Sequence, residues 1–169
     1  MQAENQPVPK WNIRSLAPND SQALAKVFQD AAEAAQWPLE SYERLIQLTG
    51  AVALVSEATT GITGLLIARQ VADEAEILNL AVLRATRRQG QASALLAAAF
   101  DRFRNSGVLR VFLEVRESNK PAIAFYAKHG FITSGRRKAY YREPAEDALC
   151  MELKFLICPS YAKIPRLPS

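Results

Sequence analysis

Residues 87–96, RRQGQASALL, have the composition of an anion-binding turn that leads into a helix. Two arginines come first, then Gly90, and then a run of alanine and leucine with helical spacing. The first-turn amides of a helix and the positive end of its dipole bind phosphate groups readily. Small residues at Gly90 and Ala92 allow a pyrophosphate to come within hydrogen-bonding distance of the backbone. The stretch therefore predicts a phosphate site at a helix N-terminus.

A helix cap is the structural interpretation of the same stretch. Thr86 and Gln89 have the spacing of a capping box, in which side chains satisfy two exposed backbone amides. Gly90 would then lie just inside the helix, where glycine costs about 1 kcal/mol relative to alanine. The motifs G-x-G-x-x-G and G-K-[ST] are absent, which excludes a dinucleotide fingerprint and a nucleotide P-loop. Cap and anion site both stay open on these residues alone.

A carboxylate stands near the end of VLRVFLEV, residues 108–115. Strand alternation places the leucines and the later valines on one face and Glu114, with Arg110 and Phe112, on the other. Ligands of α/β sheets collect at the carboxyl ends of strands. Glu114 is therefore either a group for acid–base chemistry or an edge carboxylate paired with a nearby arginine.

The elements that position these residues alternate between strand and helix periods. Hydrophobic periodicity and turn signals predict strands over 11–17, 51–57, 62–72, 74–83, 108–115, 131–141 and 147–155, and helices over 21–35, 39–48, 91–106 and 118–130. The helix between the strands at about 75–82 and 108–115 makes that pair parallel, with a right-handed crossover. The last two strands are expected to form a hairpin with a long connection through Arg142, Glu143 and Pro144.

The expected fold class is α/β (α+β), with a mostly antiparallel sheet of six to seven strands, one parallel splayed junction and about four flanking helices. A chain of 169 residues suits one domain. We expect a flexible arm over 1–10, one domain over 11–154 and a proline-containing tail over 155–169.

Composition excludes several classes of protein. The longest apolar runs are too short for a membrane span, and the first residues have no secretory pattern, so a cytoplasmic location is expected. Cys150 and Cys158 with the single His129 make neither a disulfide framework nor a metal site. The net charge of +4 is concentrated in basic clusters over 84–88 and 136–142. These clusters suit phosphate groups or an acidic partner, or they are solvated basic faces.

Several motifs resemble a known enzyme family. The spacing Arg87-x-x-Gly90-x-Ala92 matches the [RQ]-x-x-G-x-[GA] loop of the GNAT N-acetyltransferases, which binds the pyrophosphate of acetyl-CoA. Longer stretches resemble the RimI-type ribosomal-protein-alanine N-acetyltransferases: NLAV (79–82), LEVRESN (113–119), AFYAKHGF (124–131), GRRKAYYREP (135–144) and EDALCMEL (146–153). The resemblance covers roughly residues 10–154 and is strongest from 76 onward.

The resemblance implies acetyl-CoA as co-substrate, without a metal, and assigns roles to the residues in these motifs. Glu114, in LEVR, is implied as the general base for the amine, and Tyr126 as the general acid that protonates the CoA thiolate. The implied acetyl-CoA contacts are Leu80, Ala81, Val82, Arg87, Arg88, Gln89, Gly90, Gln91, Ala92, Ser93 and Asn119. Ser93 stands where many relatives carry Arg or Lys, Ala92 replaces the commoner second glycine, and LRATRR lacks the usual D-P turn.

The acceptor side is implied by two aromatic groups. Tyr140 and Tyr141 lie in the stretch 136–141, which resembles the family's loop over the peptide site; a hairpin surface is the alternative. Trp37 and Tyr42 stand where the family has a helix segment that walls the acceptor groove; core packing is the alternative.

The implied activity is direct acetyl transfer to the N-terminal amine of a protein, at alanine or a similar small residue, with a ribosomal protein as the expected target. An α-amine has a pKa near 8 and a lysine side chain one near 10.4, so a carboxylate base removes a proton from an N-terminal amine more easily than from a lysine. One alternative is acetylation of a small amine or a lysine side chain. Another is a non-catalytic module that binds CoA or RNA; no direct nucleic-acid or membrane role is otherwise expected.

Overall fold

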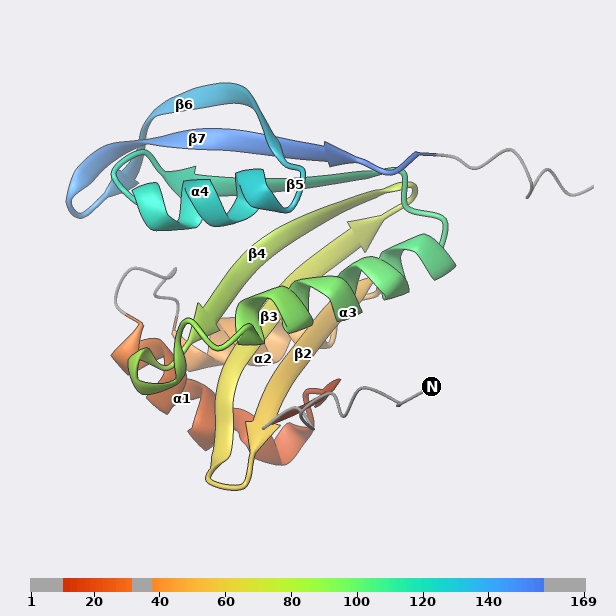
Figure 1. Cartoon of the computed structure of the whole chain (residues 1–169), viewed down its shortest axis with the longest axis vertical. Helices are drawn as coiled ribbons and strands as arrows, with labels where there is room; N and C mark the ends of the chain where they lie inside the picture. Colours follow the sequence, from red (N-terminus) through yellow and green to blue (C-terminus); the bar gives the residue numbers. More distant parts are fainter. Residues whose placement is uncertain (1–10, 32–37, 157–169) are drawn as a thin grey trace, which may run out of the picture.

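The computed structural model describes residues 11–31 and 38–156, which form one seven-stranded mixed sheet with helices on both faces (Figure 1). The strands are β1 (Trp11–Ser15), β2 (Ala51–Ala58), β3 (Gly61–Val71), β4 (Glu74–Val82), β5 (Arg110–Arg116), β6 (Ile132–Arg142) and β7 (Ala145–Lys154). Their order in the sheet is β1-β2-β3-β4-β5-β7-β6. Only β4 and β5 pair in parallel in this part of the chain, which confirms the expected fold class and junction.

Helices cover the sheet in two groups. The helices are α1 (Ser21–Asp30), α2 (Leu39–Ile46), α3 (Gln91–Asn105) and α4 (Lys120–Lys128), with short 3-10 turns η1 (Pro18–Asp20) and η2 (Arg84–Thr86). Leu95, Phe103 and Tyr126 from α3 and α4 pack into one buried cluster with the inner face of β5. Phe28 from α1 and Tyr42 from α2 stack at 4.1 Å in a second cluster on the other face. None of the helices within 11–31 and 38–156 has the length and apolarity that crossing a membrane requires.

The two parallel strands separate after four residue pairs. Pairing between β4 and β5 runs from Glu74 with Arg110 to Ile77 with Leu113 and then stops, although both strands continue. The next residue of β4, Leu78, has no partner in β3, so it forms a bulge between Ile77 and Asn79. A bulge bends its strand and increases the local twist. Figure 1 shows β4 and β5 close together at one end and diverging toward their carboxyl ends, which opens the middle of the sheet.

Helix α4 follows its sequence signals closely. Asn119 is the N-cap, and its side chain accepts a hydrogen bond of 3.2 Å from the amide of Ala122. Pro121 stands in the first turn, where its missing N–H costs nothing. The cap and the proline fix the start of the helix directly after β5.

The predicted connection in the last hairpin and the predicted end of the first helix are both wrong. The last hairpin has no long loop, because β6 extends to Arg142 and β7 begins at Ala145, so only Glu143 and Pro144 join them. Helix α1 ends at Asp30, with Ala31 as its C-cap, rather than continuing as one helix to residue 35; the rest of the expected helix falls outside the described residues.

Removal of a large core side chain tests this packing. Phe103 is 0% exposed in the cluster under α3, and we expect Phe103→Ala to lower the free energy of unfolding by about 3–5 kcal/mol through lost burial and a residual cavity. Leu156 is 98% exposed, so Leu156→Ala should change the free energy of unfolding by less than about 0.5 kcal/mol. Urea denaturation measures both, and equal effects would contradict the described core.

Candidate active site

A cleft of about 1300 Å³ opens where β4 and β5 separate. Its walls are the last half of β4, the turn before α3, the end of β5, one side of α4 and the β6–β7 turn. The predicted residues that line it are Leu80, Ala81, Val82, Arg87, Arg88, Gly90, Gln91, Ala92, Ser93, Glu114, Asn119, Tyr126, Tyr140 and Tyr141. Gln89 is exposed and is absent from this lining, and Trp37 lies outside the described residues.

Gly90 begins the helix rather than lying inside it, so the capping-box interpretation is wrong. Helix α3 starts at Gln91, and its N-cap Gly90 has φ +88°, in the left-handed region that favours glycine. Thr86 instead belongs to η2, four residues before the N-cap. Within the described residues the N-cap supplies no side-chain hydrogen bond to α3, and Gln91, Ala92 and Ser93 of its first turn line the cleft. Such an N-terminus suits an anion.

Gln91 lines the cleft but directs its side chain into a buried polar network. Its Nε2 donates to Thr63 Oγ1 at 2.9 Å, and its Oε1 accepts from Thr86 Oγ1 at 3.1 Å. Thr63 in turn donates to the carbonyl oxygen of Ser56 at 3.3 Å. Gln91, Thr63 and Ser56 are all buried. This network ties the first residue of α3 and the turn before it to β2 and β3, and it predicts a fixed position for the helix end.

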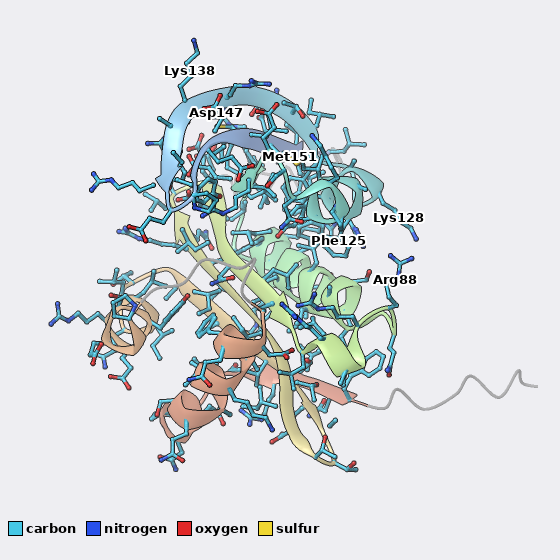
Figure 2. All side chains as sticks on the ribbon, turned by 90° about the vertical axis from the view of Figure 1, so that its left-hand side faces the viewer. Arg88, Phe125, Lys128, Lys138, Asp147 and Met151 are labelled. Carbon is cyan, nitrogen blue, oxygen red and sulfur yellow. The ribbon has the colours of Figure 1, made fainter. Side chains whose placement is uncertain are left out.

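The arginines before α3 have different surroundings. Arg87 donates from Nε to the carbonyl oxygen of Val82 at 2.9 Å, which ties the turn to the end of β4. Arg88 is exposed, with φ +61°. Figure 2 shows Arg88 on one side of the cleft opening and Lys128 and Phe125 of α4 on the other. Cationic side chains thus stand on both sides of the cleft opening.

The last half of β4 offers backbone to the cleft. Leu80, Ala81 and Val82 pair with β3 on one side, and β5 has already separated from β4 on the other. The backbone edge of β4 therefore faces the cleft over these residues. An extended ligand arm with amide groups suits such an edge, because peptide-like groups bond to unpaired strand backbone.

Glu114 is held by two side chains of β6. Its Oε1 accepts from Arg137 Nη1 at 2.5 Å, so the alternative of an arginine-paired carboxylate describes its contacts correctly. Tyr140 also bonds to Glu114, and this hydrogen bond, ahead of burial, raises the pKa of the Tyr140 phenol to about 12. Arg137 additionally lies 4.4 Å from the Tyr140 ring centroid. The carboxylate is thus oriented at the junction of the cleft and the β6–β7 hairpin.

Glu76 is a second carboxylate at this point, and the sequence analysis missed it. It pairs in register with Phe112, two residues before Glu114 on the same face of β5. Partial burial, and next the negative charge of Glu114, raise the pKa of Glu76 above its usual range. Outward-facing glutamates at matching places on neighbouring parallel strands were the available sequence signal. Two carboxylates on one face suit a cationic group such as a protonated amine.

Tyr126 lies on the opposite wall and is 8% exposed. Its ring packs edge-on against Phe125 and Phe131, with centroids 5.3 and 5.5 Å away. Burial raises the pKa of the phenol well above its ordinary value. The group therefore keeps its proton at any ordinary pH and is a hydrogen-bond donor.

Tyr42 belongs to the core rather than to the cleft. It is 0% exposed and accepts a hydrogen bond of 2.9 Å from Asn79 Nδ2. Its predicted role in walling the acceptor groove is therefore wrong, and the core-packing alternative is correct. In the described part of the chain, no three His, Cys, Asp or Glu side chains gather as a metal-binding group.

The sheet thus splits between two parallel strands, with the N-terminus of α3 beside the split and ionisable groups on both walls. The model of the acetyltransferase (GNAT) family matches residues 21–131, and the chain belongs to this family, whose acyl donor is acetyl-CoA. 

Individual relatives agree with this assignment. The [ribosomal protein bS18]-alanine N-acetyltransferase of Escherichia coli K12 is 42% identical over 89 residues, which span 52% of this chain and 60% of the enzyme. The crystal structure of the ribosomal-protein-S18-alanine N-acetyltransferase from Escherichia coli has a TM-score of 0.81 at 29% identity, covering 91% of this chain and 99% of that one. Ard1 from Thermoplasma volcanium has a TM-score of 0.80 at 27% identity, covering 87% and 99%.

The coupling between Glu76 and Glu114 can be measured directly. We expect the side-chain carboxyl of Glu76 to titrate above its usual range in ¹³C NMR, and Glu114→Gln to lower that pKa part of the way, because one of its two causes is removed. A Glu76 pKa that Glu114→Gln leaves unchanged or raises would contradict the shared site.

The same shift makes stability depend on pH. When the pKa of a group is higher in the folded protein than in the unfolded chain, the group stabilises the fold at pH values below its unfolded pKa. This contribution is lost as the pH rises through the folded pKa. Glu76→Gln should therefore raise the free energy of unfolding more at pH 7 than at pH 4. Urea denaturation at the two pH values checks this, and a larger gain at pH 4 would contradict it.

Proposed function

We propose that the protein transfers the acetyl group of acetyl-CoA to the N-terminal α-amine of a protein, at alanine or a similar small residue, with a ribosomal protein as target. The observation that carries the proposal is one cleft that joins the uncapped end of α3 to Glu114 and Tyr126. The names of the similar Escherichia coli enzymes support the choice of acceptor.

Acetyl-CoA fits the cleft by the chemistry of its parts. The first-turn amides after Gly90 suit the pyrophosphate, with Arg88 adding charge and Gln91 keeping the helix end in place. The exposed backbone edge of β4 over Leu80–Val82 suits the amides of the pantetheine arm. The thioester is then directed toward the gap between Glu114 and Tyr126. Bound acetyl-CoA supplies the activated acetyl group.

Acetyl transfer needs a neutral amine and a stabilised leaving thiolate. In the proposed reaction Glu114 accepts a proton from the acceptor amine, directly or through water, and the amine nitrogen then bonds to the thioester carbon. The carbon–sulfur bond breaks, and Tyr126 hydrogen-bonds to the departing sulfur and gives it a proton. Tyr126 then regains a proton, through water, from the nitrogen, which carries one in excess after it has bonded to carbon. Because the pKa of the Tyr126 phenol is raised, the phenol stays protonated. Its first contribution is therefore a hydrogen bond that stabilises the thiolate.

The carboxylates favour an amine that enters as a cation. Glu76 and Glu114 attract a protonated α-amine, and Glu114 is the one oriented by Arg137 and Tyr140. An α-amine with a pKa near 8 loses its proton to such a carboxylate at a smaller cost than a lysine side chain does. The acceptor end of the cleft therefore supports N-terminal acetylation in preference to lysine acetylation.

A peptide panel tests the acceptor. We expect release of CoA thiol from acetyl-CoA with a short peptide that begins with alanine, and none with the same peptide blocked at its N-terminus. If a polyamine or an N-terminally blocked lysine peptide is turned over instead, the protein acetylates small amines or lysine side chains. Absence of acceptor-dependent thiol release would support a module that binds CoA without catalysis.

Two substitutions test the roles in the reaction. Glu114→Gln should lower kcat/KM by about 10²–10⁴-fold, as expected for loss of a general base, and Tyr126→Phe should lower kcat with little change in the KM for acetyl-CoA. Thermal unfolding of both variants controls for folding. Thiol release at the unmodified rate in both variants would overturn this assignment of residues.

The two glycines at the ends of α3 allow a matched test of the phosphate site. Gly90 and Gly107 have φ +88° and +83°, and a Cβ at either meets open space or ordinary contact, so alanine costs each roughly 1–2 kcal/mol of backbone strain. We expect Gly90→Ala to raise the Kd for acetyl-CoA about tenfold, because the amides move. Gly107→Ala should lower stability similarly and leave the Kd unchanged, as calorimetry can check. Equal Kd values would contradict the role of Gly90.

A further inference from the structure

Arg116, the last residue of β5, holds the β6–β7 turn through contacts that the proposed reaction does not use. Its Nη2 donates to the carbonyl oxygen of Glu143 at 2.9 Å, and its Nη1 donates to that of Pro144 at 3.2 Å. Nη1 also donates to Glu146 Oε2 at 3.2 Å. The guanidinium lies 4.1 Å from the ring centroid of Tyr141. One planar side chain thus binds both residues of the turn and the strands on either side.

Glu146 extends this set of contacts to the start of α4. Its Oε1 accepts from the amide of Ser118 at 2.5 Å, next to the cap residue Asn119. Hydrogen bonds from Ser118, and then from Arg116, hold the pKa of the Glu146 carboxyl below its usual range. The side chains of Arg116 and Glu146 are only 23% and 17% exposed. Charge-assisted bonds of this kind are shorter and stronger than neutral ones.

The segment of β6 beside this turn has little pairing with the rest of the sheet. Between Arg137, which pairs with Ala148, and Tyr141, which pairs with Glu146, the β6–β7 ladder loses register, and residues 138–140 stand outside it. Tyr140, which bonds to Glu114, lies in this segment and packs 5.1 Å from Tyr141. Tyr140 is thus held by Glu114 and Arg137 on one side and by Tyr141 on the other, and Tyr141 in turn lies against Arg116.

We propose that Arg116 is a positioning residue that sets the affinity for the acceptor by fixing Tyr140 and Tyr141 at the acceptor end of the cleft. Arg116 lines the cleft, but its guanidinium is engaged by the turn, Glu146 and Tyr141, so its proposed role is exerted through the turn. The donor end consists of β4, α3 and Asn119. In the described residues Arg116 makes no hydrogen bond or ion pair to β4 or α3, and it reaches Asn119 only through Glu146 and Ser118. This inference rests on the proposed function, because it is measured with an acceptor peptide.

Steady-state kinetics with an alanine-starting peptide test the proposal. Arg116→Met keeps most of the aliphatic stem and removes every polar contact, and we expect the peptide KM to rise about tenfold or more, since small displacements of positioning groups are costly. The KM for acetyl-CoA should stay within about twofold, and kcat should fall by less than the peptide KM rises, because Arg137 still holds Glu114 when Tyr140 is displaced. Arg116→Lys keeps the charge but loses the planar fork, so its peptide KM should lie between those of the unmodified protein and Arg116→Met.

Arg110→Met is the matched control at the other end of β5. Arg110 also makes an ion pair, with Glu74 at 2.5 Å, and also lies over an aromatic ring, 5.8 Å from the centroid of Phe112. It is not part of the cleft lining, so its loss should leave the peptide KM unchanged. Hydrogen exchange gives an activity-independent measure: Arg116→Met should speed amide exchange over residues 139–147, and Arg110→Met should not.

The outcomes separate this inference from the proposed function. If the unmodified protein acetylates no peptide N-terminus, the proposed function fails, whereas exchange over 139–147 still reports on the turn. If it does acetylate the peptide and Arg116→Met lowers kcat without raising the peptide KM, or raises the KM for acetyl-CoA as much, the positioning role is wrong. Should Arg116→Met not fold, Arg116→Lys decides: an unchanged peptide KM there overturns the proposal.

Discussion

The early end of pairing between β4 and β5 is the constraint on which the rest of the structure depends. Four residue pairs hold the strands together, and the bulge at Leu78 turns β4 away immediately after them. Continued pairing would fill the middle of the sheet and leave neither a cleft nor a free backbone edge on β4. The bend therefore costs the hydrogen bonds that further pairs would make, and in return it gives a ligand arm a strand edge to bind.

The walls of the cleft are kept in place by contacts from outside it. At the α3 end, the buried Gln91 is tied to Thr63 and Thr86. At the other end, Glu114 is oriented by Arg137 and Tyr140 of β6. Buried polar networks that are fully satisfied restrict their members to one arrangement. An enzyme that brings a thioester and an amine together gains from such fixed walls, because much of the barrier to reaction is the cost of orientation.

Local patterns in the sequence predicted most of the fold, because they act through neighbours in the chain. The cap and proline of α4 and the outward face of Glu114 follow from spacings of a few residues. The start of α3 at Gln91 agrees with the predicted helix over 91–106, whereas the capping-box alternative fails because η2 takes up Thr86 and the left-handed Gly90 begins the helix. The inward direction of the Gln91 side chain depends on a contact with β3, and the contacts of Arg116 depend on the last hairpin. No local pattern predicts partners so far away in the chain.

The short β6–β7 turn has a consequence for how this architecture diversifies. The residues beside the uncapped end of α3 and those around Tyr140 come from parts of the chain that meet only across the cleft. On the proposed function, changes of length or composition in the turn alter the recognition of the acceptor and leave the binding of acetyl-CoA intact. A scaffold divided in this way can acquire new acceptors by varying one hairpin, as loops on a rigid framework commonly do.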